Sequence, residues 1–370
     1  MTRLTNRAKI LLLLTTALSF FALRTIYIAF QSSLQDFTYY LGAASNFLSG
    51  KNPYLSYPSQ VYPPASLFLL TPLSLLPPSL SHSLWTTTSL ASLFFALHIF
   101  STIIFKSKSV ISTLFLFILS LQTFPVKYAL AQGQINFLVF LCFALFFDSI
   151  SKKRNHLAGL ILSLAVSLKF NPIFLVLYLL ITKNTKALLA FILCFTILNL
   201  SIDLFTAHSL NNSFLHSITN MSTHYSGYYY NTSLAALTSR LFSQPLASII
   251  NLSLSALIWF ITLIVSRKSH HLLTFSLFLI TILLTSPIAW QHYLFWSILA
   301  FLTLVSINTK HKNLPYTLFL LLSFILINLN IKDPQTISIQ SPLYSHATFG
   351  LLLLYLLLVS KHQTIRRQTH

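Results

Sequence analysis

Residues 245–266 are PLASIINLSLSALIWFITLIVS, and Arg267-Lys268 follow directly. This stretch has no charged side chain. As a helix it is long enough to cross the hydrocarbon core of a bilayer, which takes about 20 apolar residues. Similar apolar runs recur along the chain, with basic residues between them. The sequence therefore predicts an all-α polytopic membrane protein.

The composition of the whole chain supports this fold class. Of 370 residues, 55% are hydrophobic and 7% are charged, whereas soluble domains carry about 25% charged residues. The net charge of +19 would suggest nucleic acid in a soluble protein. Here the basic residues lie in short clusters between apolar runs, which is typical of membrane orientation, so no nucleic-acid partner is expected. Cys142 and Cys194 lie within apolar runs and are expected to be packing residues.

About twelve transmembrane helices are expected. Two of them are short runs, 156–170 and 172–182, which meet at the polar sequence Lys169-Phe170-Asn171-Pro172. The run 64–78 lies between two Pro-Pro pairs and predicts an interfacial or re-entrant outer helix. We expect the first run to be a retained signal anchor. The other ten runs are 10–30, 84–105, 109–126, 133–150, 187–206, 245–266, 270–288, 291–309, 313–330 and 346–361.

The distribution of basic residues predicts the orientation. One set of connections holds most of the Lys and Arg residues and is expected to face the cytoplasm, with both termini, in a cell inner (plasma) membrane. The single domain, residues 1–370, then has its outer loops, 31–63 and 207–244, on the active-site face. The cytoplasmic set is Arg3, Arg7, Lys9, Lys106, Lys108, Lys152, Lys153, Arg154, Lys183, Lys186, Arg267, Lys268, Lys310, Lys312, Lys361, Arg366 and Arg367, and the outer set is Lys51, Lys127, Lys169, Arg240 and Lys332.

The first outer loop has an acid close to the end of the first span. Asp36 is well placed to act as a base on a hydroxyl group presented at the membrane surface. It could equally be an N-cap, because an amphipathic helix is expected over residues 37–49 and Asp is a common helix start. Tyr54 and Tyr62 lie in proline-containing turns that predict a rigid, bent loop.

Polar side chains also occupy the next two outer corners. Lys127, Gln134 and Asn136 form one corner, where the amides could bind sugar hydroxyls or simply stabilise the turn. Lys169 lies between two short apolar runs, where a cation is costly without an anionic partner, so it is a functional candidate. The alternative is a lysine that snorkels to the polar surface.

The later outer segments add an imidazole and several aromatic residues. The long second loop is rich in tyrosine and leads into Asn231. Its histidines lack the spacing of a metal site, so none is expected. Trp290, His292 and Tyr293 lie in a tight connection between two spans. His292 could bind a phosphate or shuttle a proton, whereas an interfacial aromatic belt explains Trp290 and Tyr293 equally well.

Taken in order, these motifs resemble the bacterial family-87 glycosyltransferases. Members of this family are membrane mannosyltransferase-like proteins of the GT-C superfamily that use polyprenyl-phosphate sugars. The resemblance runs from residue 36 to about residue 293. The motifs are Asp36, Gly50-Lys51-Asn52-Pro53-Tyr54, Tyr62-Pro63-Pro64, Gly133-Gln134-Ile135-Asn136, Lys169 with Pro172, Asn231-Thr232-Ser233-Leu234, and Ser286-Pro287 with Trp290 and His292-Tyr293.

The resemblance implies a GT-C-like fold and an inverting transfer outside the cytoplasm. The donor would be a polyprenyl-phosphate-linked hexose, with mannose as the usual sugar of the family, and the acceptor a hydroxyl of a glycolipid, glycan or protein. Asp36 would be the catalytic aspartate of the first outer loop, and His292 and Lys169 would lie near the donor phosphate. The residues expected to bind substrate are Tyr54, Tyr62, Gln134, Asn136, Asn231, Trp290 and Tyr293.

A simple mechanism follows from these assignments. Asp36 would accept the proton of the attacking hydroxyl, and Lys169, His292 and Lys127 would stabilise charge on the leaving phosphate. No metal or cofactor is expected, since the outer face lacks clustered oxygen ligands. The alternative is a lipid-linked sugar flippase or a solute transporter. Transporters usually place charges or broken helices at mid-membrane, often within an internal repeat, and the absence of a repeat favours the enzyme.

Overall fold

The computed structural model describes residues 6–56, 61–106, 108–206, 209–267, 271–308, 313–331 and 341–368. Some of the basic residues that predict the membrane orientation lie outside these ranges. Within the ranges the regular elements are all helices, as expected. The basic residues that lie outside the described ranges are Arg3, Lys268, Lys310, Lys312 and Lys332.

Helices of very different lengths follow one another along the chain. Several are too short to cross a bilayer alone, and three are 3₁₀ segments (η). Their bounds are α1 Asn6–Gln31, α2 Gln35–Leu48, α3 Pro53–Ser56, α4 Pro64–Ser74, α5 Pro78–Phe105, α6 Val110–Ser120, α7 Phe124–Gln132, α8 Asn136–Ser151, α9 Asn155–Leu168, η1 Asn171–Phe174, α10 Leu175–Ile181, α11 Thr185–Phe205, α12 Leu210–His224, α13 Leu234–Leu241, α14 Leu246–Ser266, α15 His271–Thr285, η2 Gln291–Ser297, α16 Ile298–Asn308, α17 Leu314–Asn328, η3 Pro342–Ser345 and α18 His346–Gln368.

Local sequence explains where many helices begin. Pro64 and Pro78 lie in the first turns of α4 and α5, where a missing N–H is tolerated and the fixed φ suits a helix. The side chains of Asn184 and Ser233 accept hydrogen bonds from backbone N–H groups at the starts of α11 and α13. Such caps satisfy N–H groups that the helix leaves unpaired.

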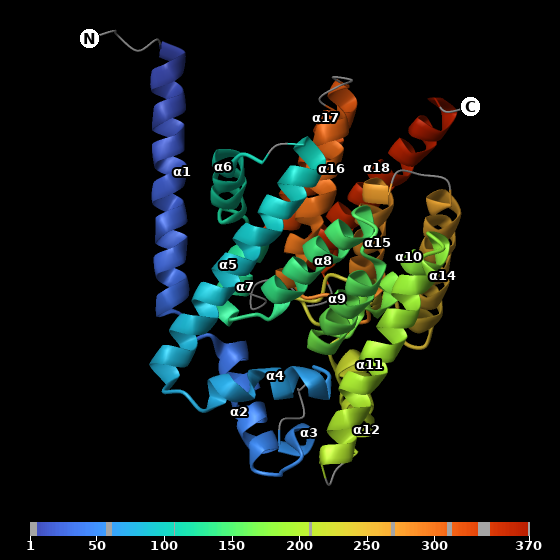
Figure 1. Ribbon diagram of the computed structural model, residues 1–370. Coiled ribbons are helices and arrows are strands. Elements are labelled where there is room, and N and C mark those ends of the chain that lie inside the picture. Colours follow the sequence, from blue (N-terminus) through green and yellow to red (C-terminus); the bar gives the residue numbers. More distant parts are fainter. Residues whose placement is uncertain are drawn as a thin grey trace.

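The helices pack around α15 at the centre. Every residue from Leu272 to Leu284 is buried, and α15 contacts α10, α14, α16 and α18. The N-terminal end of α1 and the C-terminal end of α18 lie at one end of the molecule, and α2, α3, α4 and α12 lie at the other (Figure 1). This arrangement places the first loop and the start of the second loop at the same end.

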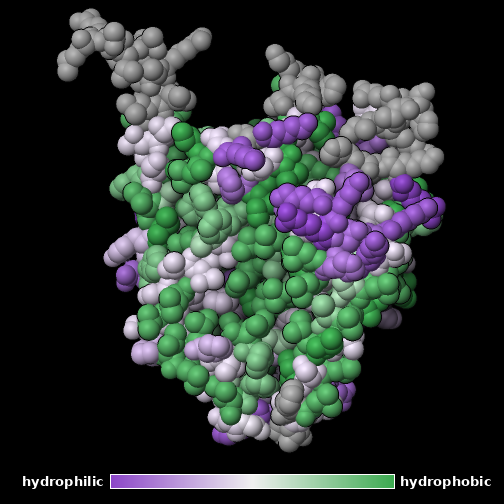
Figure 2. Space-filling view, in the orientation of Figure 1, coloured by the Kyte–Doolittle hydropathy of each residue, from purple (hydrophilic) through white to green (hydrophobic). Residues whose placement is uncertain are grey.

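The outer helices expose apolar side chains, as a lipid-facing surface does. Leu23 of α1, Leu204 of α11 and Leu252 of α14 are 67%, 83% and 72% exposed. Figure 2 shows a broad hydrophobic face, with hydrophilic residues gathered toward one end. Water disfavours so much contiguous apolar surface, so the chain is a membrane protein.

The predicted count of twelve crossings is not confirmed. Among the described residues, five segments are long and apolar enough to span a membrane, namely α1 with α2, α5, α11, α14 and η3 with α18. A sixth is possible if α6 and α7 count as one broken span. The single helix predicted over 109–126 is wrong, because the chain there forms two helices, α6 and α7, that meet at an 80° bend. Pro125 in the first turn of α7 accounts for the new start.

The short runs around Lys169 form α9 and the η1–α10 pair, as predicted. The run after Pro63 forms helix α4, which is shorter than a membrane span, and its interfacial or re-entrant position stays a prediction. Helix α9 packs closely on α11, where a Cβ on Gly159 would lie 2.4 Å from the Ala187 carbonyl oxygen. Small residues allow such close approach between membrane helices.

Candidate active site

Asp36 lies at the second position of α2, just after the turn from α1. Leu34 makes that turn with φ 46° and is the N-cap residue of α2, without a side-chain cap hydrogen bond. The Asp36 carboxylate instead accepts a hydrogen bond from the side-chain amide of Gln134. The N-cap alternative for Asp36 is therefore wrong, and its carboxylate faces the corner between α7 and α8.

Gly133 allows α2 and the α7–α8 corner to meet. It ends α7 with φ 68°, and a Cβ there would lie 2.7 Å from the Cβ of Phe37. Its carbonyl oxygen accepts a hydrogen bond of 2.7 Å from the Trp85 indole, and that indole stacks on Phe37 at 4.6 Å between ring centres. A glycine is needed here both for the positive φ and for the close approach that brings Asp36 to Gln134.

Two phenols complete the surroundings of Gln134. The hydroxyls of Tyr40 and Tyr62 share a hydrogen bond of 2.6 Å, and each oxygen lies 3.3 Å from Gln134 Oε1, where the hydroxyl whose proton is not used between them donates. The hydroxyl of Tyr54 donates to the backbone oxygen of Tyr62 at 2.6 Å. Burial, followed by the nearby Asp36, raises the pKa of Tyr62, so its hydroxyl stays protonated and available as a donor. Tyr54 therefore stabilises the loop, and Tyr62 lines the site.

Lys169 lies at the break between α9 and η1, where the chain is extended. Its ammonium donates to Asn136 Oδ1 at 2.7 Å and lies 3.3 Å from the centre of the Tyr293 ring. The side chain is 3% exposed, so it does not snorkel to the surface. Among the described residues, no carboxylate lies within ion-pair distance of it.

A line of hydrogen-bonded polar side chains thus joins the Asp36 carboxylate to the Lys169 ammonium. Asp36 bonds to Gln134, Gln134 Oε1 accepts from Asn136 Nδ2 at 3.4 Å, and Asn136 accepts from Lys169. The bridge keeps the two charges in one site without a direct ion pair. A carboxylate and an ammonium held apart in this way can act on different atoms of one substrate.

His292 lies beside this line in η2. Its ring centre is 4.8 Å from that of Tyr293 and 5.5 Å from that of Tyr128. The side chain is 5% exposed, and both ring nitrogens lack a hydrogen-bond partner among the described residues. Buried polar atoms are normally paired, so the imidazole is a candidate for binding a substrate.

Asn231 and Trp290 join the second loop to the connection before His292. Asn231 Oδ1 accepts from the backbone N–H of Ala289 at 3.0 Å, and its Nδ2 donates to the carbonyl oxygen of Pro287 at 3.0 Å. The two segments also form an isolated β-bridge between Asn231 and Trp290. Backbone groups thus use the Asn231 amide, which gives it a structural role rather than a direct contact with substrate.

Lys127 lies apart from Lys169. Together with Arg24 it lines a small pocket of about 150 Å³ between α1 and α7. On α7 it precedes Tyr128, the residue that contacts His292. The structure therefore does not bring Lys127 together with Lys169 and His292, contrary to the prediction from the sequence.

Arg240 is a buried residue that the sequence analysis did not select. It is 6% exposed and donates to the carbonyl oxygens of Tyr228 at 2.7 Å, Asn231 at 2.8 Å and Tyr344 at 3.3 Å, and to Ser345 Oγ at 2.9 Å. It thus joins three segments of the chain. One feature of the sequence could have identified it. Arg240 follows the Asn231-Thr232-Ser233 motif by seven residues and has no acidic residue nearby in the sequence with which to pair.

A second acid on the same side of the chain has a structural role. Asp203 accepts hydrogen bonds from the backbone N–H groups of Leu210 and Asn211 at 2.9 and 3.2 Å. These groups begin α12, so Asp203 caps that helix. Among the described residues, no three His, Cys, Asp or Glu side chains gather as a possible metal site.

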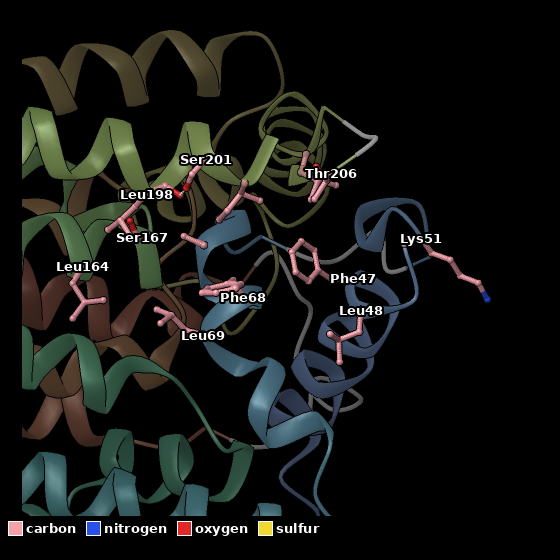
Figure 3. A pocket seen from close by; sticks show the side chains of 14 residues that line it. Phe47, Leu48, Lys51, Phe68, Leu69, Leu164, Ser167, Leu198, Ser201 and Thr206 are labelled. Atoms are coloured by element: carbon pink, nitrogen blue, oxygen red, sulfur yellow. Dashed lines mark hydrogen bonds between the residues drawn. The ribbon is translucent and has the colours of Figure 1, made fainter. Parts of the chain in front are cut away.

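An apolar pocket of about 590 Å³ adjoins the Lys169 segment (Figure 3). Figure 3 shows the Lys51 side chain pointing away from it. Phe170, next to Lys169, packs against a cluster that includes three of the pocket's lining residues, Ala65, Ile202 and Leu210. Other lining residues are Phe47, Phe68, Leu69, Leu164, Ser167 and Leu198.

Comparison with known proteins gives the family. Residues 61–287 match glycosyltransferase family 87, whereas no curated protein matched the sequence. The matched range contains Gln134, Asn136 and Lys169, starts after Asp36 and ends before His292. It covers more than half of the 370 residues. The chain therefore belongs to glycosyltransferase family 87 and is a membrane enzyme that transfers sugar from a donor to an acceptor.

Proposed function

We propose that this enzyme transfers a hexose, which we take to be mannose, from a polyprenyl-phosphate donor to an acceptor hydroxyl outside the cytoplasm, with inversion. Asp36 is the general base. The observation that carries the proposal is the line of polar groups from Asp36 through Gln134 and Asn136 to Lys169. It holds a proton acceptor and a cation in one buried site.

In the transfer, the Asp36 carboxylate acts on the acceptor hydroxyl and the Lys169 ammonium acts on the donor phosphate. The acceptor oxygen attacks the anomeric carbon while its proton passes to the Asp36 carboxylate. The bond between that carbon and the phosphate oxygen breaks on the opposite face, so the configuration inverts. The bonding electrons stay with the lipid phosphate, and the charge that it gains is stabilised by Lys169 and by a hydrogen bond from His292.

The apolar pocket supports a lipid-linked donor. Its volume of about 590 Å³ is within the range of ligand pockets, roughly 300–1,000 Å³. One of its walls comes from α9, where Ser167 precedes Lys169 by two residues. A polyprenyl chain in this pocket would leave its phosphate at the end of α9, close to the ammonium.

Replacement of Asp36 by Asn tests the base. Asn keeps the shape of the side chain but cannot accept the proton, so sugar transfer from labelled polyprenyl-phosphate mannose in membranes should be abolished. Asp203→Asn is the matched control, because Asp203 only caps α12, and it should retain transfer. Full activity of the Asp36 variant would contradict the assignment, and label that only changes leaflet would indicate a flippase.

Sidedness is the second test. The proposal places residues 36 and 292 on the extracytoplasmic face and both termini in the cytoplasm. Single cysteines at the neighbouring exposed positions 35 and 287 should react with a membrane-impermeant thiol reagent only from the outside. Labelling of the two positions from different sides would contradict the proposal.

A further inference from the structure

Aromatic side chains of the second outer loop gather next to the active site. We call Tyr225, Tyr228, Tyr229, Tyr230 and Trp290 the aromatic platform. Tyr225 and Tyr228 each contact Trp290, with ring centres 5.4 and 5.7 Å apart, and Tyr229 lies 4.0 Å from Tyr230. Tyr228 is 37% exposed, and the other four are half-buried. The platform is therefore partly exposed, with Tyr228 as its most exposed residue.

The platform reaches the active site through one further ring. Tyr230 lies 5.4 Å from Tyr128, and Tyr128 lies 5.5 Å from His292, measured between ring centres. The aromatic surface thus runs without interruption from Tyr228 at the surface to the imidazole beside Lys169. An interfacial aromatic belt lies at the membrane surface and does not explain aromatic contacts that continue inward to His292.

Backbone hydrogen bonds hold the platform in place. The carbonyl oxygen of Tyr230 accepts from the N–H of Gln291 at 3.1 Å, and that of Tyr228 accepts from Arg240 at 2.7 Å. The Asn231 amide bonds to the backbone of Pro287 and Ala289, which ties this loop to the segment before Trp290. A surface that is already ordered loses little conformational entropy when a ligand binds.

The chemistry of the platform suits a neutral, hydroxyl-rich ring. A pyranose presents C–H groups on one face, which pack on aromatic rings, and hydroxyls at its edge, which bond to phenols. Burial, followed by the neighbouring hydroxyls of Tyr230 and Tyr228, raises the pKa of Tyr229, so the phenol remains a neutral donor. The platform contains no charged side chain, unlike a site for phosphate.

We propose that the aromatic platform is the subsite for a sugar ring of the acceptor, with Tyr228, Tyr230 and Trp290 as its stacking residues. The acceptor then enters from the second loop past Tyr128 and His292, while the donor lipid lies in the pocket beside Phe170. This assignment rests on the proposed function, because it gives the acceptor its place relative to Asp36 and Lys169.

Binding of sugars without any donor tests the subsite. Mannotriose, maltotriose and cellotriose are neutral probes for saturation-transfer NMR with the purified full chain in nanodiscs. At least one should receive saturation at its ring C–H protons. Affinity should fall on the order of tenfold in Tyr228→Ala/Tyr230→Ala and much less in Tyr228→Phe/Tyr230→Phe, which keeps the rings. Tyr27→Ala, which removes a 66% exposed ring on α1, is the matched control and should bind like the native chain.

The outcomes separate this inference from the proposed function. In transfer assays the double Ala variant should raise KM for the acceptor about tenfold and leave KM for the donor unchanged. Absence of saturation transfer to all three sugars, or equal affinity in the native and Ala chains, overturns the subsite. Sugar binding that depends on the platform, in a chain that transfers no sugar, leaves the subsite standing and overturns the proposed reaction.

Discussion

The ammonium of Lys169 lies 3.3 Å from the centre of the Tyr293 ring and donates a hydrogen bond to Asn136. The ring face offers partial negative charge, and the amide oxygen offers a dipole, so the cation is stabilised without a direct carboxylate partner. This leaves its positive charge available to an anionic ligand. A lysine paired with an acid would be partly neutralised before the donor binds.

Lys169→Met should therefore lower kcat by about 100-fold or more, the effect of removing one preorganised electrostatic group. Folding should persist, because apolar replacement of a buried charged group is often tolerated. The measurement is transfer of labelled sugar by purified protein, with thermal melting as the check on folding. Lys186→Met, at an exposed position of α11, is the control. A Lys169 variant with nearly native kcat would remove the lysine from the reaction.

Gly133→Ala should destabilise the protein and separate Asp36 from Gln134. The left-handed backbone conformation costs about 1–2 kcal/mol for an L-residue, and the new Cβ would clash with Phe37. Gly50→Ala is a matched control for stability, because Gly50 has φ 70° but no atom within 4 Å of the added Cβ. Thermal melting should show a clearly larger loss for Gly133→Ala. Equal losses would mean that the contact with Phe37 contributes nothing.

Much of the site could be anticipated from the sequence, because polar residues in an apolar chain are conspicuous. Lys169 interrupts two apolar runs, and the structure places it at the break between α9 and η1 as expected. Its contact with Asn136, however, depends on how α8 and α9 rotate about their axes. No local pattern specifies that rotation, so the resemblance to a family was needed to group these residues.

The errors have identifiable physical causes. Hydropathy treats residues 109–126 as one run because the residues around the bend are mostly uncharged, yet Pro125 starts a new helix and α7 turns by 80°. The same bend directs Lys127 toward Arg24 and Tyr128 toward His292. Arg240 escaped notice because its partners are backbone oxygens, including that of Tyr344. Such partners leave no signature in side-chain types.

His292→Asn should affect catalysis and spare the fold. Neither ring nitrogen bonds to a described residue, so replacing the imidazole breaks no hydrogen bond among the described residues. We expect kcat to fall by roughly 10²-fold, in the range of a lost acid–base or hydrogen-bonding group. Thermal melting and transfer kinetics measure the two effects. A large fall in melting temperature with unchanged kcat would make His292 a structural residue.

Arg240→Met should unfold or strongly destabilise the region where Tyr228, Asn231 and Tyr344 meet. Its guanidinium donates hydrogen bonds to the carbonyl oxygens of Tyr228, Asn231 and Tyr344. Each buried acceptor left unpaired lowers the free energy of unfolding by about 1–3 kcal/mol. Arg240→Lys keeps the charge but lacks the planar fork that reaches several acceptors at once, so its stability should fall between those of Met and Arg. Thermal melting of the three proteins measures this order. If the Lys variant matches Arg in stability while the Met variant is destabilised, a single ammonium satisfies these acceptors and the planar fork of the guanidinium is unimportant.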